Sequence, residues 1–390
     1  MIPVEEARRL VLSRCLPLNP RAVALDDALG CVTSVAVTAL DPVPAFANTA
    51  MDGFAVRAAD TNGAPVTLEV VATIAAGATG EGVTVGPGQA ARIMTGAPMP
   101  DGADAVVMVE LTSAEGEKVV VQQEVPPGNH VRHPGEDIEA GAEVFPAGTV
   151  LGPGHLGVLA NLGLRKVPVF PRARVGVLST GDELVNGQIE DSNRPALLAL
   201  CRQSGFEAVD LGCVGDTGEE IAAALEQSAA GTDAIVTTGG VSAGDFDFVK
   251  RLLDTQLQVA IKPAKPFAFG AVDGTPVFGL PGNPVSSLVS FELFARPAIR
   301  QMMGYAEHDL DRPHVTAIAE EDLGRRPDGK THFARVVARY DDDGGRWRVR
   351  SAGGQGSHQL LAMATANALA VLPDGNGVNA GERVTVMLLL

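Results

Sequence analysis

The chain has 390 residues, more than one hydrophobic core usually supports, so we expect two to four domains. Hydrophobic residues make up 46% of it and charged residues 20%, an ordinary balance that excludes gross disorder. The formal net charge of −17 would repel a phosphate backbone, which argues against nucleic acid as a partner. An acidic chain that binds an anionic ligand must gather its few cations locally.

We expect a cytoplasmic protein with no membrane attachment. No apolar run reaches the roughly 18 residues that span a bilayer. The first residues lack the basic and apolar stretches of a signal peptide. The four cysteines form no CxxC pair, which favours reduced thiols over a disulfide or zinc site.

The first 170 residues are predicted to be mostly β. An amphipathic helix is expected over residues 4–16, where apolar residues recur at helical spacing. Residues 65–125 alternate short Val-rich segments with Gly/Pro turns, which is typical of a small barrel or sandwich. The expected strands are Val66–Ala72, Gln89–Met94, Ala105–Leu111 and Val119–Val125, and a short helix is expected near His155–Leu162.

From Pro171 onward, strand and helix patterns alternate, which predicts a doubly wound domain with a parallel sheet covered by helices. The expected strands are Arg174–Leu178, Ala208–Leu211, Ala234–Thr237, Val259–Ile261 and Pro276–Leu280. Four helices are expected. One begins after Asn193, and the others span Glu219–Ala230, Asp247–Asp254 and Val285–Met303.

Residues 312–390 return to β. The segments Phe333–Tyr340 and Arg346–Ser351 flank an Asp/Gly-rich hairpin turn. Two further strands are expected at Ala368–Leu372 and Arg383–Leu389, so a small terminal barrel is the simplest architecture.

Ligands of doubly wound sheets bind at the carboxyl ends of the strands, and four loops at that edge carry candidate chemistry. The loop Ser179–Leu184 holds carboxylates that suit a general base or a cation ligand, with helix capping as the alternative. The glycines of Thr237–Asp247 would let the backbone approach an anion, although the loop matches neither a P-loop nor GxGxxG.

The other two loops lie further along the same domain. Lys262–Pro266 carries two lysines that could compensate a bound anion, with a solvated surface pair as the alternative. Gly279–Ser287 forms a rigid Pro-Gly-Asn-Pro turn whose two serines could cap the following helix or donate to a ligand. We expect the four loops to form one rim.

Outside that domain, Asn48–Val56 contains a Met-Asp-Gly turn, and Thr95–Pro98 and Gly135–Ile138 are further turn candidates. None of these would be diagnostic alone. The seven histidines show no metal-ligand spacing, and no Ser-His-Asp or Cys-His set is evident.

Taken together and in order, these motifs resemble the MoeA-type molybdopterin molybdenumtransferases, the family that includes the gephyrin E domain. The matching segments are Asn48–Val56, Ile93–Pro100 with Gly102–Val107, Gly135–Ile138, Ser179–Leu184, Asp191–Asn193, Thr238–Asp247, Lys262–Gly270 and Gly279–Ser287. They run through essentially the whole chain, which makes the resemblance highly specific.

The resemblance implies an α/β plus β fold: a doubly wound molybdopterin-binding α/β domain, additional β-rich domains and a C-terminal β-barrel. Its four domains would be residues 1–45 with 140–170, 46–139 with the Met-Asp-Gly motif, 171–304 and 312–390. It also implies a homodimer, with the active site between the α/β domain of one subunit and the Met-Asp-Gly domain of the other.

The implied reaction inserts molybdenum from molybdate into adenylylated molybdopterin, with release of AMP and assistance from Mg²⁺. A molybdopterin adenylyltransferase would be the upstream partner. Cleaving a phosphoanhydride needs anion neutralisation and a divalent cation held by carboxylates, which suits the acidic and basic loops. The alternatives are a non-catalytic molybdopterin-binding or scaffold protein of the same fold, and an adenylate hydrolase acting on another pterin or nucleotide.

The resemblance also implies roles for individual residues. The catalytic acidic set is Asp52, Glu183, Asp216 and Asp247, with Mg²⁺ assigned to Glu183 and Asp247. Molybdate or the pterin phosphate would be held by Lys262, Lys265 and Arg335, and phosphate cradled by Gly239, Gly240 and Ser242. Further matches to substrate-binding positions are Thr95, Asp137, Pro281 and Pro284.

The chain departs from the family pattern at three places. The loop after Leu184 is short, Gln258 stands where several relatives have a lysine, and Ala362 occupies a position that is often serine. None of these changes removes the acidic set, so we expect activity to be retained with altered substrate affinity.

Overall fold

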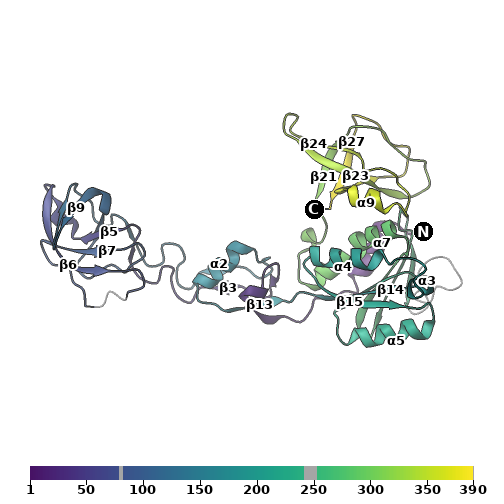
Figure 1. The fold of residues 1–390 in the computed structure, drawn as a ribbon, viewed down its shortest axis with the longest axis horizontal. Helices are drawn as coiled ribbons and strands as arrows, with labels where there is room; N and C mark the ends of the chain where they lie inside the picture. Colours follow the sequence, from purple (N-terminus) through teal and green to yellow (C-terminus); the bar gives the residue numbers. More distant parts are fainter. Residues whose placement is uncertain (79–81, 241–252, 390) are drawn as a thin grey trace. The chain divides into compact units, whose positions relative to one another are not determined.

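The computed structural model describes residues 1–78, 82–240 and 253–389 (Figure 1). They divide into two compact units. The larger unit comprises Met1–Ser34, Gly148–Gly152 and Lys166–Leu390, and the smaller unit comprises Val35–Ala147 and Pro153–Arg165. No helix among these residues is long and apolar enough to cross a membrane.

A six-stranded sheet forms the centre of the larger unit. Its strands, in spatial order, are β15 (Glu207–Val214), β14 (Arg174–Thr180), β16 (Ala234–Thr238), β20 (Thr275–Leu280), β19 (Pro266–Val272) and β17 (Thr255–Gln258). The first four are parallel, as predicted, whereas β19 and β17 are antiparallel to their neighbours. The expectation of a wholly parallel sheet is therefore wrong for one strand: β19 runs opposite to the other five.

The reason lies in a two-residue turn between β19 and β20. Asp273 and Gly274 have φ values of 49° and 82°, and they join strands whose register pairs Val272 with Thr275. Asp-Gly is a favoured sequence for such a hairpin turn, because both residues need positive φ. The predicted strand Val259–Ile261 is also reassigned: β18 (Ile261–Lys262) pairs outside this sheet.

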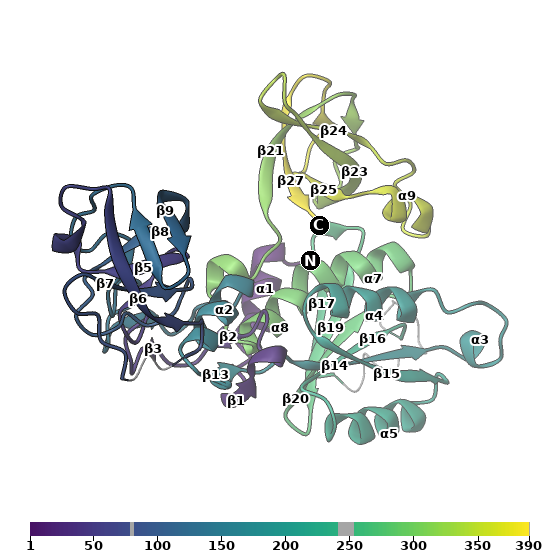
Figure 2. The same ribbon diagram turned by 60° about the vertical axis from the view of Figure 1, so that its left-hand side comes forward.

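Helices cover both faces of this sheet (Figures 1 and 2). On one face lie α4 (Asn193–Gln203) and α7 (Pro284–Ser290), and on the other lies α5 (Gly218–Ala229). Each face has its own buried apolar cluster, one including Leu197 and Val289 and the other including Ile221. The expected doubly wound arrangement is thus confirmed.

The predicted helix Val285–Met303 is a continuous helical stretch with an irregular centre. It comprises α7, a π-helical segment η4 (Phe291–Ala295) and α8 (Arg296–Met302). The N-terminal helix α1 (Val4–Leu12) packs against the cluster that contains the buried side of this stretch. Most of the predicted helix Asp247–Asp254 lies outside the described residues.

The C-terminal segment forms a closed five-stranded barrel, as expected. Its strands follow the order β23 (Thr331–Asp341), β24 (Arg346–Ser351), β21 (His314–Ala319), β27 (Arg383–Leu388) and β25 (Ala368–Leu372), and β25 pairs again with β23. Its interior holds a separate apolar cluster that includes Val336, Val349 and Val386. Shorter elements are β22 (Leu323–Gly324), β26 (Gly377–Val378) and α9 (Leu360–Thr365).

Three segments far apart in the chain meet where the barrel joins the α/β domain. Ile2 exchanges main-chain hydrogen bonds with the strip 258–260: its N–H donates to the Gln258 carbonyl (2.9 Å), and its carbonyl accepts from Ala260 (2.8 Å). The Thr331 N–H donates to the Ala260 carbonyl (2.9 Å), and β18 pairs with β23 in parallel register, Lys262 opposite His332. The α/β domain therefore contributes a strand to the edge of the barrel.

The remaining elements are mainly β. In the larger unit, β1 (Arg21–Ala24), β13 (Lys166–Phe170) and β2 (Val32–Thr33) form a small antiparallel sheet. The smaller unit is built on a six-stranded sheet in the order β8 (Ala105–Met108), β5 (Gly53–Val56), β7 (Gln89–Ile93), β6 (Val66–Ile74), β10 (Lys118–Val121) and β9 (Thr112–Glu115). It also contains β3 (Val37–Thr38), β4 (Asn48–Thr49), β11 (Val131–Arg132), β12 (Glu143–Phe145) and α2 (Pro153–Asn161).

Candidate functional site

Two cavities open near the carboxyl ends of the parallel strands in the larger unit. One has a volume of about 440 Å³ and is lined by four carboxylates, Glu183, Glu190, Asp191 and Asp216, with no lysine or arginine among its described lining residues. We call it the acidic cavity. The other, of about 1060 Å³, is rich in lysine and arginine, and we call it the basic cavity. Gly282 and Asn283 line both.

The acidic cavity is formed by loops that follow β14, β15, β16 and β20. Two of them are joined by reciprocal main-chain to side-chain hydrogen bonds: Asp182 N–H donates to Asp216 Oδ2 (3.3 Å), and Asp216 N–H donates to Asp182 Oδ1 (3.1 Å). Glu183, in the short helix α3 (Asp182–Val185), is exposed at the cavity wall. The structure thus brings Glu183 and Asp216 to one cavity, and Asp247 lies outside the described residues.

Asn193, at the start of α4, ties together the loops that shape this cavity. Its side-chain amide donates to Thr238 Oγ1 (2.8 Å) and to the carbonyl of Gly282 (2.7 Å). Asp191 fixes the start of the same helix, because its Oδ1 accepts from the N–H groups of Asn193 (3.1 Å) and Arg194 (3.0 Å). The sequence analysis matched Asp191–Asn193 to the family pattern but assigned these residues no role, since their function depends on distant loops.

Gly239 occupies a position that no other residue would fit. Its φ is +103°, and a Cβ there would lie 2.5 Å from the Thr180 carbonyl oxygen and 2.7 Å from Thr180 Oγ1. Gly240, with φ +65°, lines the cavity beside it. Both predicted glycines therefore lie at the acidic cavity, with Pro284 on its wall, whereas Ser242 lies outside the described residues.

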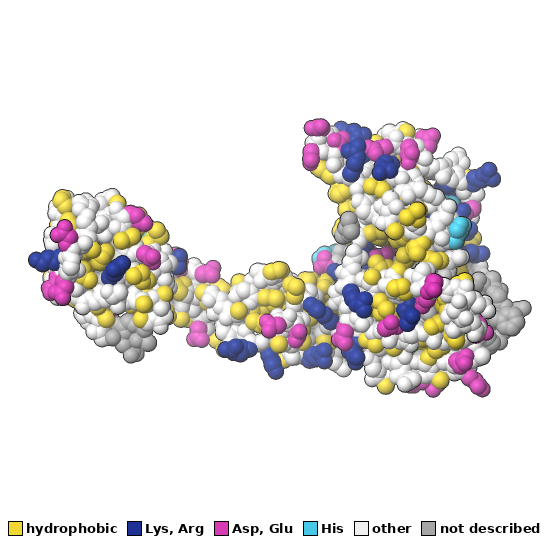
Figure 3. All heavy atoms as spheres, in the orientation of Figure 1, with side chains coloured by type: hydrophobic (Ala, Val, Ile, Leu, Met, Phe, Trp, Pro, Cys, Tyr) yellow, Lys and Arg dark blue, Asp and Glu magenta, His cyan; other side chains and the backbone are white. Residues whose placement is uncertain are grey.

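The basic cavity concentrates positive charge in an otherwise acidic chain. Among the described residues, six of the chain's 30 lysines and arginines line it, against one carboxylate, Asp328. These cations are Lys262, Lys265, Arg325, Arg326, Lys330 and Arg335. By contrast, acidic and basic side chains are interspersed over the face of the molecule shown in Figure 3.

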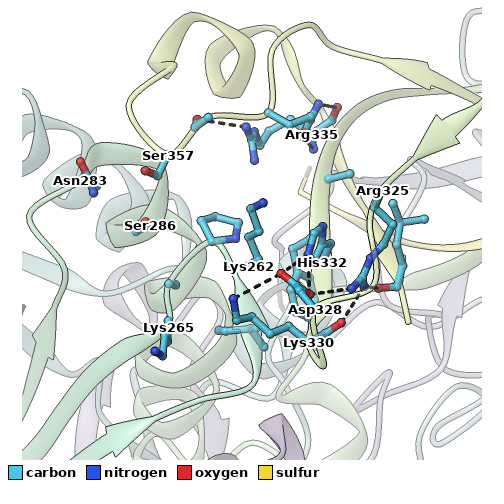
Figure 4. A pocket seen from close by; sticks show the side chains of 18 of the residues that line it. Lys262, Lys265, Asn283, Ser286, Arg325, Asp328, Lys330, His332, Arg335 and Ser357 are labelled. Carbon is cyan, nitrogen blue, oxygen red and sulfur yellow. Dashed lines mark hydrogen bonds and ion pairs between the residues drawn. The ribbon is translucent and has the colours of Figure 1, made fainter. Parts of the chain in front are cut away.

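The cations of the basic cavity come from opposite sides (Figure 4). Lys262 belongs to β18 and Lys265 precedes β19, whereas the other four come from the barrel and the segment that enters it. Pro281 also lines this cavity. The four predicted loops therefore line two adjoining cavities rather than one rim, and the Pro281–Pro284 turn lies between the two.

Arg335 is the most deeply buried of these cations, at 1% exposure. One of its guanidinium nitrogens donates to the carbonyls of Gly354 and Gly356 (both 3.1 Å), and among the described residues it forms no ion pair with a carboxylate. Burial lowers the pKa of Arg335, but an arginine stays charged at neutral pH. A buried, uncompensated positive charge favours an anion in the cavity.

A charge network at the outer wall was missed by the sequence analysis. Asp328 accepts from Arg325 (2.7 Å) and Lys330 (3.3 Å), and both of its oxygens lie 3.2 Å from His332 Nε2. Arg325 is also paired with Asp374 (2.8 Å). The dense charge between residues 325 and 332 was the available signal, but charged runs are more often solvated surface than a cavity wall.

The remaining predicted residues lie in the smaller unit. The Asp52 carboxylate accepts from the N–H and the hydroxyl of Thr95, both at 2.7 Å, and the hydroxyl hydrogen bond is the main cause of a lowered pKa at Asp52. The Asp137 N–H donates to the Val43 carbonyl (3.0 Å), and its side chain is exposed. Asp52 and Thr95 therefore form one hydrogen-bonded group.

The acidic cavity offers hard oxygen ligands of the kind that Mg²⁺ takes. Among the described residues, however, no group of three or more His, Cys, Asp or Glu side chains is arranged to hold a metal ion. Glu183 and Asp216 fit as two carboxylate ligands, and phosphate oxygens and water commonly complete a Mg²⁺ shell.

Comparison with known proteins identifies the family. Residues 2–163 match the model "MoeA N-terminal region (domain I and II)", residues 176–301 the model "Probable molybdopterin binding domain" and residues 317–389 the model "MoeA C-terminal region (domain IV)". The chain is 41% identical to "Molybdopterin molybdenumtransferase 2" of Mycobacterium tuberculosis, over 96% of each chain. It is 37% identical to "Molybdopterin molybdenumtransferase" of Haemophilus influenzae, over 99% of this chain and 98% of that one.

A solved structure agrees with these matches. The crystal structure of the "molybdopterin biosynthesis moeA protein" from Pyrococcus horikoshii OT3 superposes with a TM-score of 0.77 at 30% identity, covering all of both chains. Full-length relatives above 30% identity and three consecutive family models confirm the resemblance inferred from the motifs. The chain belongs to the MoeA family of molybdopterin molybdenumtransferases.

Proposed function

We propose that the chain is a molybdopterin molybdenumtransferase that inserts molybdenum from molybdate into adenylylated molybdopterin and releases AMP. Relatives that match the chain over 94% to 98% of their own length carry this enzyme name. The observation that carries the finer proposal is the pairing of an acidic and a basic cavity that share Gly282 and Asn283. The reaction brings the molybdate anion to a pterin that carries a phosphoanhydride. It therefore needs a cation-rich site for the anion next to a carboxylate-rich site that can hold Mg²⁺ at the phosphates.

The basic cavity is the proposed anion site. Lys262, Lys265 and Arg335 would hold molybdate or the pterin phosphate through charge-assisted hydrogen bonds. The buried Arg335 would fix the position of the anion, because its guanidinium is itself held by two carbonyls. The two lysines are exposed and would move to meet the ligand.

The acidic cavity is the proposed phosphoanhydride site. Glu183 and Asp216, together with Asp247, would hold Mg²⁺. The bound ion would neutralise the charge that develops on the phosphate oxygens. The N–H groups around Gly239 and Gly240, with Ser242, would cradle phosphate, since the glycine backbone lets it approach closely. The carboxylates would also orient the attacking water, so the chain's own contribution is positioning and charge.

We further propose a cytoplasmic homodimer of four-domain chains that receives its substrate from a molybdopterin adenylyltransferase. In the dimer, the Asp52 and Thr95 group of one copy, with Asp137, would complete the acidic cavity of the other. The two hydrogen bonds from Thr95 support this proposal, because they hold the exposed Asp52 carboxylate in one orientation.

The test is a reaction with adenylylated molybdopterin, Mg²⁺ and molybdate, followed by quantification of AMP and of pterin-bound molybdenum. We expect AMP release that depends on both molybdate and Mg²⁺. Absence of molybdate-dependent AMP release would refute the transferase. Tight pterin binding without turnover would instead favour the scaffold alternative, and AMP release that ignores molybdate would favour the hydrolase.

A further inference from the structure

One histidine lies within the cation-rich wall of the basic cavity. His332 is the only histidine among the described residues that line it, and its side chain is 14% exposed. It stands on β23 directly opposite Lys262 of β18 in parallel register, so the two side chains leave the same face of adjacent strands. Figure 4 shows both at the same cavity.

The charges that face His332 come from every element around it. Lys262 lies on β18, and the segment before β23 contributes Arg325, Asp328 and Lys330. Asp374, after β25, pairs with Arg325. With the histidine neutral, three cations face two carboxylates, so the surroundings already carry one excess positive charge.

This environment favours the neutral form of the imidazole in the free protein. Burial is the main cause of a lowered pKa at His332, and the charges of Arg325 and Lys262 lower the pKa further, while Asp328 opposes them. The hydrogen bond with Asp328 has the second-largest effect on the pKa of His332 and raises it, but it does not reverse the lowering, and Arg325 and Lys330 share the same carboxylate. An anion beside Lys262 would remove the repulsion and favour the imidazolium form.

We infer that His332 is a proton-dependent binding residue of the basic cavity: entry of a tetrahedral oxyanion is coupled to uptake of a proton by His332. The inference deepens the proposed function, since it rests on the basic cavity as the molybdate site. By linkage, the affinity for the oxyanion is highest at low pH, falls as the pH rises through the histidine's range and levels off once His332 is neutral with or without the anion.

A purely structural role makes a different prediction. If His332 only tethered Asp328, its protonation would not respond to the anion, and the pH profile of binding would be the same without it. Proton uptake on anion binding therefore distinguishes the two roles, because loss of the hydrogen bond to Asp328 alone would not produce it.

The experiment is calorimetric titration of the full-length protein with sodium molybdate from pH 6.5 to 8.5, in buffers of different ionisation enthalpy. We expect the dissociation constant to rise about threefold to tenfold across this range, with uptake of up to about one proton per anion at its lower end. In His332→Gln, which keeps a polar side chain without the titration, we expect a flat profile. The control is His314→Gln, an exposed histidine on β21 of the same barrel that does not line the basic cavity, and it should match the wild type.

A wild-type profile that is flat, or equally steep in His332→Gln, overturns the inference and leaves the transferase proposal standing. Failure of the wild type to bind molybdate at any pH overturns both. If His332→Gln fails to fold, the decisive measurement is an NMR titration of the His332 ring in the wild type. Its midpoint must shift upward when molybdate is present, and an unchanged midpoint refutes the coupling.

Discussion

The side-chain amide of Asn193 donates to the carbonyl of Gly282 at 2.7 Å, and Gly282 lines both the acidic and the basic cavity. The same amide also donates to Thr238 Oγ1 at the end of β16. One uncharged side chain therefore connects the end of β16, which leads into the loop proposed to bind phosphate, with the turn that lies between the two cavities.

We predict that Asn193→Ala lowers kcat by about tenfold to a hundredfold, because misplacing bound groups by about 1 Å has that cost. The loss of two hydrogen bonds should reduce the free energy of unfolding by only about 1–3 kcal/mol. Activity and chemical denaturation are measured on the same preparation. Asn161→Ala, at an exposed position in α2, is the control. Equal kcat in the two variants would show that Asn193 does not position the loops.

Gly239→Ala should abolish turnover. A Cβ would meet the Thr180 carbonyl oxygen at 2.5 Å, so the loop would have to shift away from β14. Gly157→Ala in α2 is the matched control, since its Cβ would meet nothing within 4 Å and alanine favours a helix. We expect the control to retain activity and gain up to about 1 kcal/mol of stability. A Gly239→Ala enzyme with wild-type turnover would exclude close approach of substrate at this loop.

Lys262→Ala should raise the molybdate concentration needed for half-maximal rate by about tenfold or more, with a smaller effect on kcat, because one charge-assisted hydrogen bond is worth roughly 1.5–3 kcal/mol. Lys166→Ala, an exposed lysine on β13, removes the same charge away from the cavity. The comparison separates local binding from a change in net charge. An unchanged molybdate dependence in Lys262→Ala would remove this lysine from the anion site.

Glu183→Gln and Asp52→Asn should each reduce turnover far more than they reduce stability, since both side chains are exposed. The hydrogen bonds from Thr95 lower the pKa of Asp52, so its carboxylate stays ionised at a lower pH than an ordinary aspartate does. The ratio of wild-type to Asp52→Asn activity should therefore be constant between pH 5 and 9, in assays at about one-unit steps. A ratio that collapses toward one near neutral pH would contradict this assignment.

Glu292 should matter for stability. It is 1% exposed in its side chain, it receives two hydrogen bonds from Arg312 (3.0 and 2.9 Å), and Arg296 lies 3.8 Å from it. Glu292→Ala would leave two buried arginines without a counter-ion, which costs about 3–5 kcal/mol. Glu207→Ala breaks the exposed pair with Arg174 and should cost less than about 1 kcal/mol in the same denaturation experiment. Similar losses in the two variants would refute the role of burial.

The fold could be predicted from the sequence where local patterns determine it. The apolar runs gave the parallel strands β14, β16 and β20, and helical spacing gave α5 and the long C-terminal helix of the α/β domain. The antiparallel direction of β19 was not foreseen, because the strand itself was not recognised and its Asp-Gly turn was not used as a hairpin signal. The π-helical segment contains Glu292, whose buried ion pair with Arg312 joins residues far apart in the chain, and periodicity does not contain that information.

The candidate site divides in the same way. Motifs after strands located Glu183 and Gly239 at one cavity, because the carboxyl ends of parallel strands meet at one edge. Lys262 was singled out for its charge, and it lies in β18, outside that sheet. The division into two cavities could not be foreseen, since it requires the barrel to supply the opposite wall. A role for His332 could not be predicted for the same reason, because only the pairing of β18 with β23 places it opposite Lys262.

The pairing of β18 with β23 also means that the basic cavity can form only late in synthesis, after the barrel strand β23 has been made. Domains fold as the chain emerges, N-terminal portions first. Lys262 and Lys265 are synthesised before Arg325, Arg326, Lys330 and Arg335, so for a time the nascent chain holds only two of the six described cations of the basic cavity. Ile2 pairs with Gln258 and Ala260, which are made much later, and Ala260 in turn accepts a hydrogen bond from Thr331 at the start of β23. A product truncated before β23 would include the six-stranded sheet and the helices of the α/β domain, but it would lack Arg335 and the barrel wall of the basic cavity.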